Sequence, residues 1–166
     1  DPNLFPNIVK IVDKYDIPHE YIEFELTESS FISDNHKLVE LTYNLQKGGF
    51  HVLMDDFGSG YSSLDVLQSI KFDLLKFDMG FMRKLDESNA GRIILTELMK
   101  MATSLGVDTI CEGVETAAQV HFLQEIGCSK LQGFYYTKPI SSEAVLERYK
   151  KGIAIGFENP AETSYY

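Results

Sequence analysis

Short apolar runs alternate with longer segments of helical periodicity along most of the chain. The short runs are rich in β-branched and aromatic residues, a composition that favours strands. Strands are predicted at residues 21–26, 51–55, 72–77, 107–111 and 130–134. Helices are predicted at residues 8–15, 37–46, 63–69, 90–104, 117–126 and 142–150. Residues 151–166 lose this rhythm and are predicted to be a tail after a domain at 1–150.

Periodicity also predicts which side of a helix is buried. In the segment that begins at Ala90, apolar residues recur three and four positions apart, at Ile94, Leu98, Met101 and Leu105. That spacing places them on one helical face and predicts that this face packs on the strands. Gly106 and Gly127 each follow a predicted helix, where a residue in the left-handed conformation would end it.

Alternating strands and helices with short connections predict an α/β fold, with parallel strands joined by right-handed crossovers. Two architectures agree with that pattern: an open doubly wound sheet, or an arc of a (β/α)8 TIM-type barrel. A complete barrel takes ~250 residues, whereas this chain has 166. A closed barrel of ordinary size is therefore excluded. What remains is five parallel strands alternating with helices, either as an open sheet or as a partial barrel.

The charge balance narrows the range of partners. The chain has 25 Asp and Glu against 15 Lys and Arg, a formal net charge of −10. Nucleic-acid polymers and anionic membranes require clustered cations, so neither is expected as a partner.

The apolar runs are too short for a membrane span, and the first residues do not resemble a signal peptide. Cys111 and Cys128 stand in apolar surroundings and are predicted to be reduced core residues of a cytoplasmic protein.

Polar side chains lie where the predicted strands end. They are Glu25, Glu28, Asp55, Asp56, Lys76, Asp78, Glu112, Glu115 and Gln132. In a parallel sheet these ends face one rim, where such folds place their ligands. Carboxylates crowded there would repel one another without cations, and their oxygens suit Mg²⁺ or Mn²⁺. Two such ions could clamp the attacking and leaving oxygens of a phosphoryl displacement.

Lys76 is the cation of this group. It follows an apolar run at residues 72–75, where an unpaired ammonium would cost desolvation free energy. Among carboxylates it would stay charged and could hold a water or stabilise phosphate charge. Structural interpretations compete with these functional ones: a salt bridge from Lys76 to Asp78 or to a neighbouring acid, a helix N-terminal acid at Glu28, and a capping-box acid at Glu115. Asp78 could also be a loop cap.

The segment DDFGSGYSSL at residues 55–64 contains a glycine pattern after a strand. A dinucleotide fingerprint is disfavoured, because the two acids in front would lie beside the pyrophosphate. Gly58 and Gly60 are instead predicted to be hinges of a mobile loop, and Ser62 or Ser63 is predicted to cap the next helix.

Five segments resemble, in the same order, the EAL-domain family of bacterial cyclic di-GMP phosphodiesterases. They are ELTES at 25–29, DDFGSGYSSL at 55–64, KFD at 76–78, EGVET at 112–116, and QGF at 132–134 with Lys138-Pro139 after it. The resemblance runs from about Leu4 to Tyr149. It implies a (β/α)8-type barrel whose first strand is antiparallel to the rest. It also implies hydrolysis of cyclic di-GMP to linear pGpG with two Mg²⁺ or Mn²⁺ ions in a complete domain.

The resemblance implies a role for each matching residue. Metal binding would fall to Glu25, Asp55, Asp56 and Glu112, and the attacking water to Lys76 together with Glu112. Glu28 would anchor the loop after Asp56. The metal and substrate surroundings would be completed by Asp78, Glu115 and Gln132. The family's opening strand, its Glu-Ala-Leu strand and the next strand with an asparagine ligand have no counterpart here, so the chain matches the last five of eight units.

Several expectations about the chain as a whole follow. These residues alone should hydrolyse cyclic di-GMP negligibly, and they should form a homodimer or self-associate through an open strand edge. A parent protein could carry a sensory or diguanylate-cyclase-type domain, or a membrane anchor. The alternative function is a catalytically inactive cyclic di-GMP receptor, against which the retained metal-ligand positions argue. An unrelated metal-dependent barrel enzyme is disfavoured by the DDFGSGYSSL segment.

Overall fold

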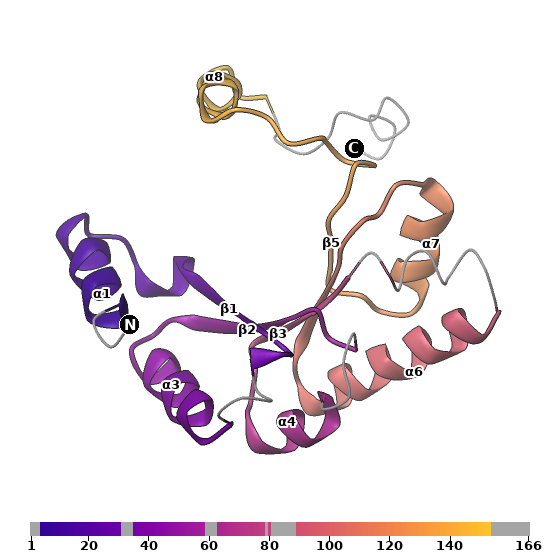
Figure 1. Cartoon of the computed structure of the whole chain (residues 1–166). Coiled ribbons are helices and arrows are strands. Elements are labelled where there is room, and N and C mark those ends of the chain that lie inside the picture. The colour runs from indigo at the N-terminus through magenta and orange to yellow at the C-terminus, as the bar shows by residue number, and fades with distance from the viewer. Residues whose placement is uncertain (1–3, 31–34, 59–62, 79, 81–88, 154–166) are drawn as a thin grey trace. The chain divides into compact units, whose positions relative to one another are not determined.

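The computed structural model describes residues 4–30, 35–58, 63–78, 80 and 89–153. The chain divides into two compact units, Asp1–Lys76 and Phe77–Tyr166, which are described in turn. Strands and helices alternate along both units (Figure 1). Within the described ranges, no helix combines the length and the apolar character needed to cross a membrane.

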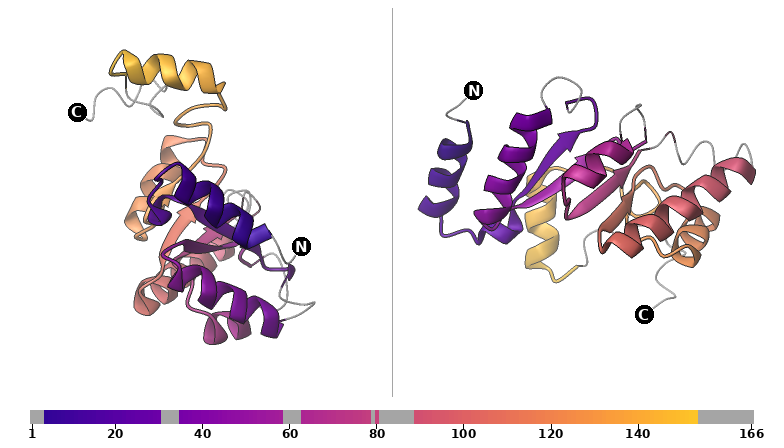
Figure 2. Two further views of the ribbon diagram at one scale, coloured as in Figure 1. Left: turned by 90° about the vertical axis from the view of Figure 1, so that its left-hand side faces the viewer. Right: turned by 90° about the horizontal axis from the view of Figure 1, so that it is seen from below.

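Three strands pair in the first unit: β1 (Glu23–Thr27), β2 (His51–Asp55) and β3 (Leu74–Phe77), whose last residue opens the second unit. Both pairings are parallel, with Glu23 opposite His51 and Leu53 opposite Leu74, so β2 lies in the middle. The helices of this unit are α1 (Leu4–Lys14), the 3-10 helix η1 (His19–Tyr21), α3 (Asn35–Lys47) and α4 (Ser63–Ser69). Figures 1 and 2 show α3 and α4 on the same side of the strands.

The middle strand of the first unit is buried on both of its faces. Val52, Leu53 and Met54 are consecutive in β2 and are 0–3% exposed. Successive side chains of a strand point to opposite faces, so burial of all three means that both faces are covered. This is the environment expected of a strand in a parallel sheet.

The second unit contains a parallel pair, β4 (Asp108–Cys111) and β5 (Lys130–Leu131). The amide of Glu112 donates to the carbonyl of Phe77 at 3.0 Å, so the end of β3 joins the hydrogen bonding of this unit. The helices are α6 (Asn89–Leu105), α7 (Ala117–Glu125) and α8 (Ser142–Lys150). The predicted alternation of five parallel strands with helices is thereby confirmed.

Three of the differences between predicted and observed element boundaries concern the first helix, the first strand and the last strand. The first helix begins at Leu4 rather than residue 8, because Pro6 falls in its first turn, where no amide hydrogen bond is needed. Tyr21 lies in η1, which follows Pro18, so β1 starts only at Glu23. The last strand stops at Leu131 instead of continuing to residue 134.

The buried face of α6 was wrongly predicted. Ile94 and Leu105 are 54% and 51% exposed, whereas Leu95, Met99 and Ala102 are fully buried. The buried residues have the same helical spacing, displaced by one position. α6 is apolar around much of its circumference, and its contacts with β4 decide which stripe faces inward. The predicted helix ends at Gly106 and Gly127 are confirmed, with φ of 68° and 82°.

Gly133 explains why the last strand is short. A side chain at this position would overlap the backbone of Val114, so the two segments touch without any intervening side chain. The amide of Val114 donates to the Gln132 carbonyl at 3.1 Å, and the amide of Tyr135 donates to the Val114 carbonyl at 2.9 Å. The loops that follow β4 and β5 are therefore fastened together at a residue that must be glycine.

His19 ties together three parts of the first unit. Its Nδ1 lies 2.6 Å from the carbonyl oxygen of Gly48, and its Nε2 lies 2.8 Å from Oδ1 of Asp13. The ring also stacks on Phe50, with centroids 4.2 Å apart. Both polar partners only accept hydrogen bonds, so the imidazolium form, in which both ring nitrogens donate, satisfies both contacts. The hydrogen bond to Gly48, followed by that to Asp13, raises the pKa of His19.

We expect the His19→Gln substitution to destabilise the protein in a pH-dependent way. A raised pKa in the folded state stabilises fully below the unfolded value of about 6.5, and this stabilisation is lost as pH rises through the folded pKa. The difference in unfolding free energy between wild type and variant, measured with urea, should therefore be largest at mildly acidic pH and shrink at alkaline pH. His121→Gln, at an exposed histidine of α7, is the control. A difference independent of pH would refute the imidazolium assignment.

We expect the Gly133→Ala substitution to cost about 2–3 kcal/mol of unfolding free energy, because the added methyl group must displace the Val114 backbone. Hydrogen exchange at the amides of Val114 and Tyr135 should also accelerate. Gly106→Ala is the control, because open space surrounds that position and only its left-handed conformation is strained. It should leave exchange at Val114 and Tyr135 unchanged. Equal acceleration in both variants would contradict the proposed close contact.

Candidate functional site

A charged cluster lies at the C-terminal ends of the strands in the first unit. The Nζ of Lys76 donates to Oε1 of Glu25 at 2.9 Å and lies 3.2 Å from Oδ1 of Asp55. The Lys76 side chain is 10% exposed, against 23% for Asp55 and 48% for Glu25. The expected convergence of these three residues is observed. The ammonium pairs with two carboxylates at once, which agrees with the predicted salt bridge from Lys76 to a neighbouring acid.

Strand pairing positions the three side chains. Asp55 is the last residue of β2 and lies opposite Thr27 of β1, two residues beyond Glu25. The ladder continues past the strands, with the Glu28 amide donating to the Asp55 carbonyl at 3.1 Å and the Phe57 amide donating to the Lys76 carbonyl at 3.0 Å. These bonds fix the backbone on either side of the cluster.

Glu28 is a buried acid that contacts the segment after Asp56. It is 1% exposed, and its Oε2 accepts a hydrogen bond from the Gly58 amide at 3.1 Å. Gly58 has a φ of 84°, as expected of a turn that only glycine adopts easily. The predicted hinge at Gly60 and cap at Ser62 lie outside the described residues, while α4 begins at Ser63.

Asp56 has a backbone conformation that is rare for its residue type. Its φ is 56°, in the left-handed region, where only glycine is free of a steric penalty. Its amide donates to Oδ1 of Asp55 at 3.0 Å, so this one oxygen is close both to an amide and to the Lys76 ammonium. Asp56 itself is exposed. Strained backbone of this kind often occurs at functional sites.

The remaining predicted residues lie in the second unit. Glu112, Glu115 and Gln132 line a pocket of about 150 Å³, together with Gly113, Gly133 and Phe134. Glu112 follows β4 directly, and the Gln132 amide donates to the Cys111 carbonyl at 2.9 Å. Asp78 accepts a hydrogen bond from the Gly80 amide at 3.0 Å, as a loop cap does.

The capping box of α7 is formed by Thr116 and Gln119, so the structural interpretation of Glu115 as its acid is wrong. Thr116 is the N-cap, and its hydroxyl accepts from the Gln119 amide at 3.2 Å. The Gln119 side chain accepts from the amides of Glu115 and Thr116, at 2.8 and 3.0 Å. Thr and Gln three residues apart are the sequence signal that would have identified this box. Glu115 is thereby held just before the helix.

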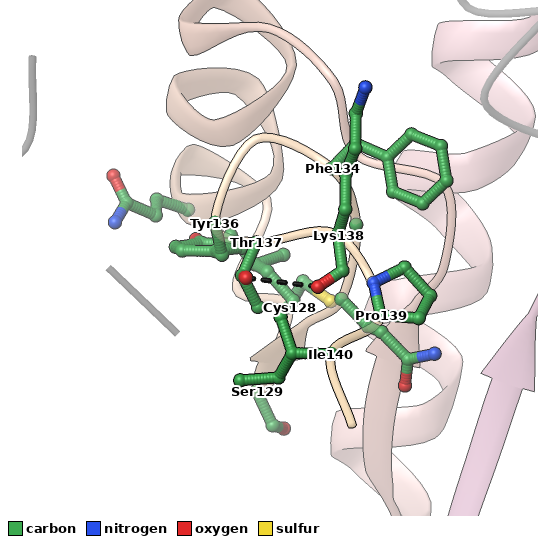
Figure 3. A pocket seen from close by; sticks show the side chains of 12 residues that line it. Cys128, Ser129, Phe134, Tyr136, Thr137, Lys138, Pro139 and Ile140 are labelled. Atoms are coloured by element: carbon green, nitrogen blue, oxygen red, sulfur yellow. Dashed lines mark hydrogen bonds between the residues drawn. The ribbon is translucent and has the colours of Figure 1, made fainter. Parts of the chain in front are cut away.

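A larger pocket of the second unit, about 700 Å³, is bounded by Cys128 and the segment that follows β5 (Figure 3). The Thr137 hydroxyl donates to the Lys138 carbonyl at 3.0 Å. Phe134 is exposed, and the Lys138 ammonium lies 5.8 Å from its ring centroid. Cys128 is partly exposed on this pocket, so its prediction as a core residue is wrong, while that of Cys111 is confirmed.

The carboxylates of the first unit have the chemistry of a metal site. Glu25 and Asp55 direct oxygens at one cation, the Lys76 ammonium, and carboxylate oxygens are ligands that Mg²⁺ and Mn²⁺ prefer. Asp56, the residue after Asp55, adds a third carboxylate. Among the residues described here, no three side chains of His, Cys, Asp or Glu already converge as a complete metal cage. The donor set fits a divalent ion, and the pair would form only part of its coordination.

Known proteins resemble this chain over most of its length. The cyclic di-GMP phosphodiesterase RocR of Pseudomonas aeruginosa is 33% identical over 144 residues, which are 87% of this chain and 37% of RocR. The structure of the PaMucR phosphodiesterase in complex with c-di-GMP shares 30% identity at a TM-score of 0.80, covering 86% of this chain and 58% of that one.

A manganese and cyclic di-GMP complex of BlrP1 from Klebsiella pneumoniae is 26% identical, with a TM-score of 0.78, and covers 84% of this chain and 36% of BlrP1. This chain spans about a fifth of the length of several other curated relatives. These likenesses identify the fold as part of a TIM-type barrel. The EAL domain family matches at residues 1–139. The chain with its cluster of Lys76, Glu25 and Asp55 therefore belongs to the EAL-domain family.

Proposed function

We propose that this chain is the C-terminal part of a metal-dependent phosphodiesterase domain that hydrolyses cyclic di-GMP to linear pGpG. The observation that carries the proposal is the pairing of the nearly buried Lys76 ammonium with the carboxylates of Glu25 and Asp55. RocR, a relative at 33% identity, is a cyclic di-GMP phosphodiesterase, and PaMucR was solved with c-di-GMP. Both support this substrate for the present chain.

Glu25, Asp55, Asp56 and Glu112 are the proposed metal ligands. The carboxylates of Glu25 and Asp55 already share one cation, and the BlrP1 complex with manganese supports a divalent ion in such domains. When bound, two Mg²⁺ or Mn²⁺ ions would supply positive charge for phosphoryl transfer. A complete domain must provide further ligands, because two converging carboxylates do not fill the coordination shell of such an ion.

Lys76 and Glu112 are proposed to act on the attacking water. Lys76 is held by two carboxylates, so its ammonium stays charged and fixed in place, able to hold a water and to stabilise charge on the phosphate. Glu112, the carboxylate that follows β4, is proposed to accept a proton of that water.

The other residues are proposed to shape the site around these groups. Glu28 would anchor the loop after Asp56 through its bond to the Gly58 amide. Asp78, Glu115 and Gln132 would complete the metal and substrate surroundings.

We propose a domain at residues 1–150, followed by a tail that lies mostly outside the described residues. The free thiols of Cys111 and Cys128 agree with a cytoplasmic location. We also propose that the protein forms homodimers and that a parent protein carries a sensory or diguanylate-cyclase-type domain.

Asp55→Asn should reduce hydrolysis of cyclic di-GMP at least about a hundredfold, because a charged ligand is lost and each metal stabilises the transition state by several kcal/mol. The test uses a complete domain, made by joining this chain to the preceding segment of RocR, and measures pGpG formation at saturating Mg²⁺. Asp56→Asn should act similarly. Asp108→Asn, at the opposite end of β4, is the control and should retain full activity. Full activity of both Asp55 and Asp56 variants would reject the two-metal role.

Lys76→Met should lower kcat by about 10²–10³-fold with a smaller effect on KM, because the ammonium stabilises charge that develops in the transition state. The same joined domain is used, and circular dichroism checks that the variant remains folded. Lys100→Met, at an exposed lysine of α6 paired with Glu97, is the control. A variant that binds cyclic di-GMP and turns it over at the wild-type rate would show that Lys76 is only structural. A wild-type domain that binds cyclic di-GMP without hydrolysing it would instead identify a receptor.

A further inference from the structure

Cys111 and Cys128 are brought together in the second unit although 16 residues separate them along the chain. Thr109 and Cys111 are two positions apart in β4, so their side chains point to the same face, and both are buried. The hydroxyl of Thr109 lies 3.7 Å from Sγ of Cys128. Sγ of Cys128 also donates to the Lys130 carbonyl at 3.1 Å, at the level where Lys130 pairs with Ile110. The Cys128 sulfur therefore lies along the face of β4 that carries Cys111.

The surroundings of the two thiols differ. Cys111 is fully buried, whereas Cys128 lines the pocket of about 700 Å³, where its sulfur lies among the side chains of the wall (Figure 3). The nearby Cys111 side chain lowers the pKa of the Cys128 thiol. An accessible thiol that ionises more easily, beside a buried one, is the arrangement of an attacking and a resolving cysteine.

We propose that Cys111 and Cys128 form a disulfide when the folded protein meets hydrogen peroxide. The Cys128 thiolate attacks a peroxide oxygen, the O–O bond breaks, and the thiol proton leaves with the departing oxygen as water. Cys128 is then a sulfenic acid. The Cys111 sulfur attacks the Cys128 sulfur, the S–O bond breaks, and the hydroxyl group leaves as a second water with the Cys111 proton. Two thiols are oxidised to one disulfide, and one peroxide is reduced to two waters.

The test treats the folded 166-residue chain with hydrogen peroxide, blocks remaining thiols with a maleimide in denaturant, and measures intact mass and linked peptides. We expect the loss of two hydrogen atoms, no maleimide, and a peptide joining Cys111 to Cys128 that a reductant separates. The crosslink should form faster in buffer than in urea, because the fold holds the sulfurs together. Equal rates in buffer and urea would overturn the proposal. So would a disulfide that joins two chains through Cys128 while Cys111 still takes the maleimide.

Single substitutions separate the two roles. In Cys111→Ala, peroxide should leave a sulfenic acid at Cys128 that dimedone traps, because no resolving thiol remains. In Cys128→Ala, the buried Cys111 should stay reduced in the folded chain and take the maleimide only after unfolding. Oxidation of Cys111 in the folded Cys128→Ala variant, at the wild-type rate, would show that Cys128 is not the reacting thiol. Both variants are compared by circular dichroism with the wild type, and the crosslink in the unsubstituted chain decides the matter if either fails to fold.

Discussion

The pairing of the Lys76 ammonium is the interaction on which the first unit depends. Its side chain is almost buried at the ends of parallel strands, and a charge in such a place is stable only when opposite charges compensate it. The compensating carboxylates come from β1 and β2, two different strands. A slip of one residue in either strand would turn Glu25 or Asp55 to the opposite face. Strand register and charge pairing therefore depend on each other.

This cluster is better explained by function than by stability. A buried ion pair recovers little more than its desolvation cost, and apolar side chains of similar size would stabilise the strands as well. The protein nevertheless has carboxylates beside Lys76, a further acid at Asp56 with a left-handed backbone, and a buried acid at Glu28. Such a concentration of acids at the strand ends agrees with the proposed metal site, because carboxylates crowded together repel one another less when cations lie between them.

Backbone contacts hold the candidate residues of the second unit in place. The close approach of Gly133 to Val114 fastens the loop after β5 to the loop after β4. The capping box of Thr116 and Gln119 fixes the start of α7 and takes up the amide of Glu115. Glu112, Glu115 and Gln132 thus stand on loops whose positions are set by rigid neighbours, as is usual for residues that bind or react.

The sequence by itself determined the alternation of strands and helices, the parallel topology, and the family, because periodicity and motif order are local properties of the chain. It also indicated that Lys76 needs a partner, since an apolar run precedes it. Other features required the tertiary structure. Local spacing cannot choose between Asp78, two residues away, and Glu25, 51 residues away in the chain, as the partner of Lys76. α6 carries two apolar stripes, and only its contact with β4 selects Leu95, Met99 and Ala102. The approach of Cys128 to Thr109, on the face of β4 that also carries Cys111, likewise follows from the pairing of β4 with β5, because contacts between distant residues arise only when the strands assemble.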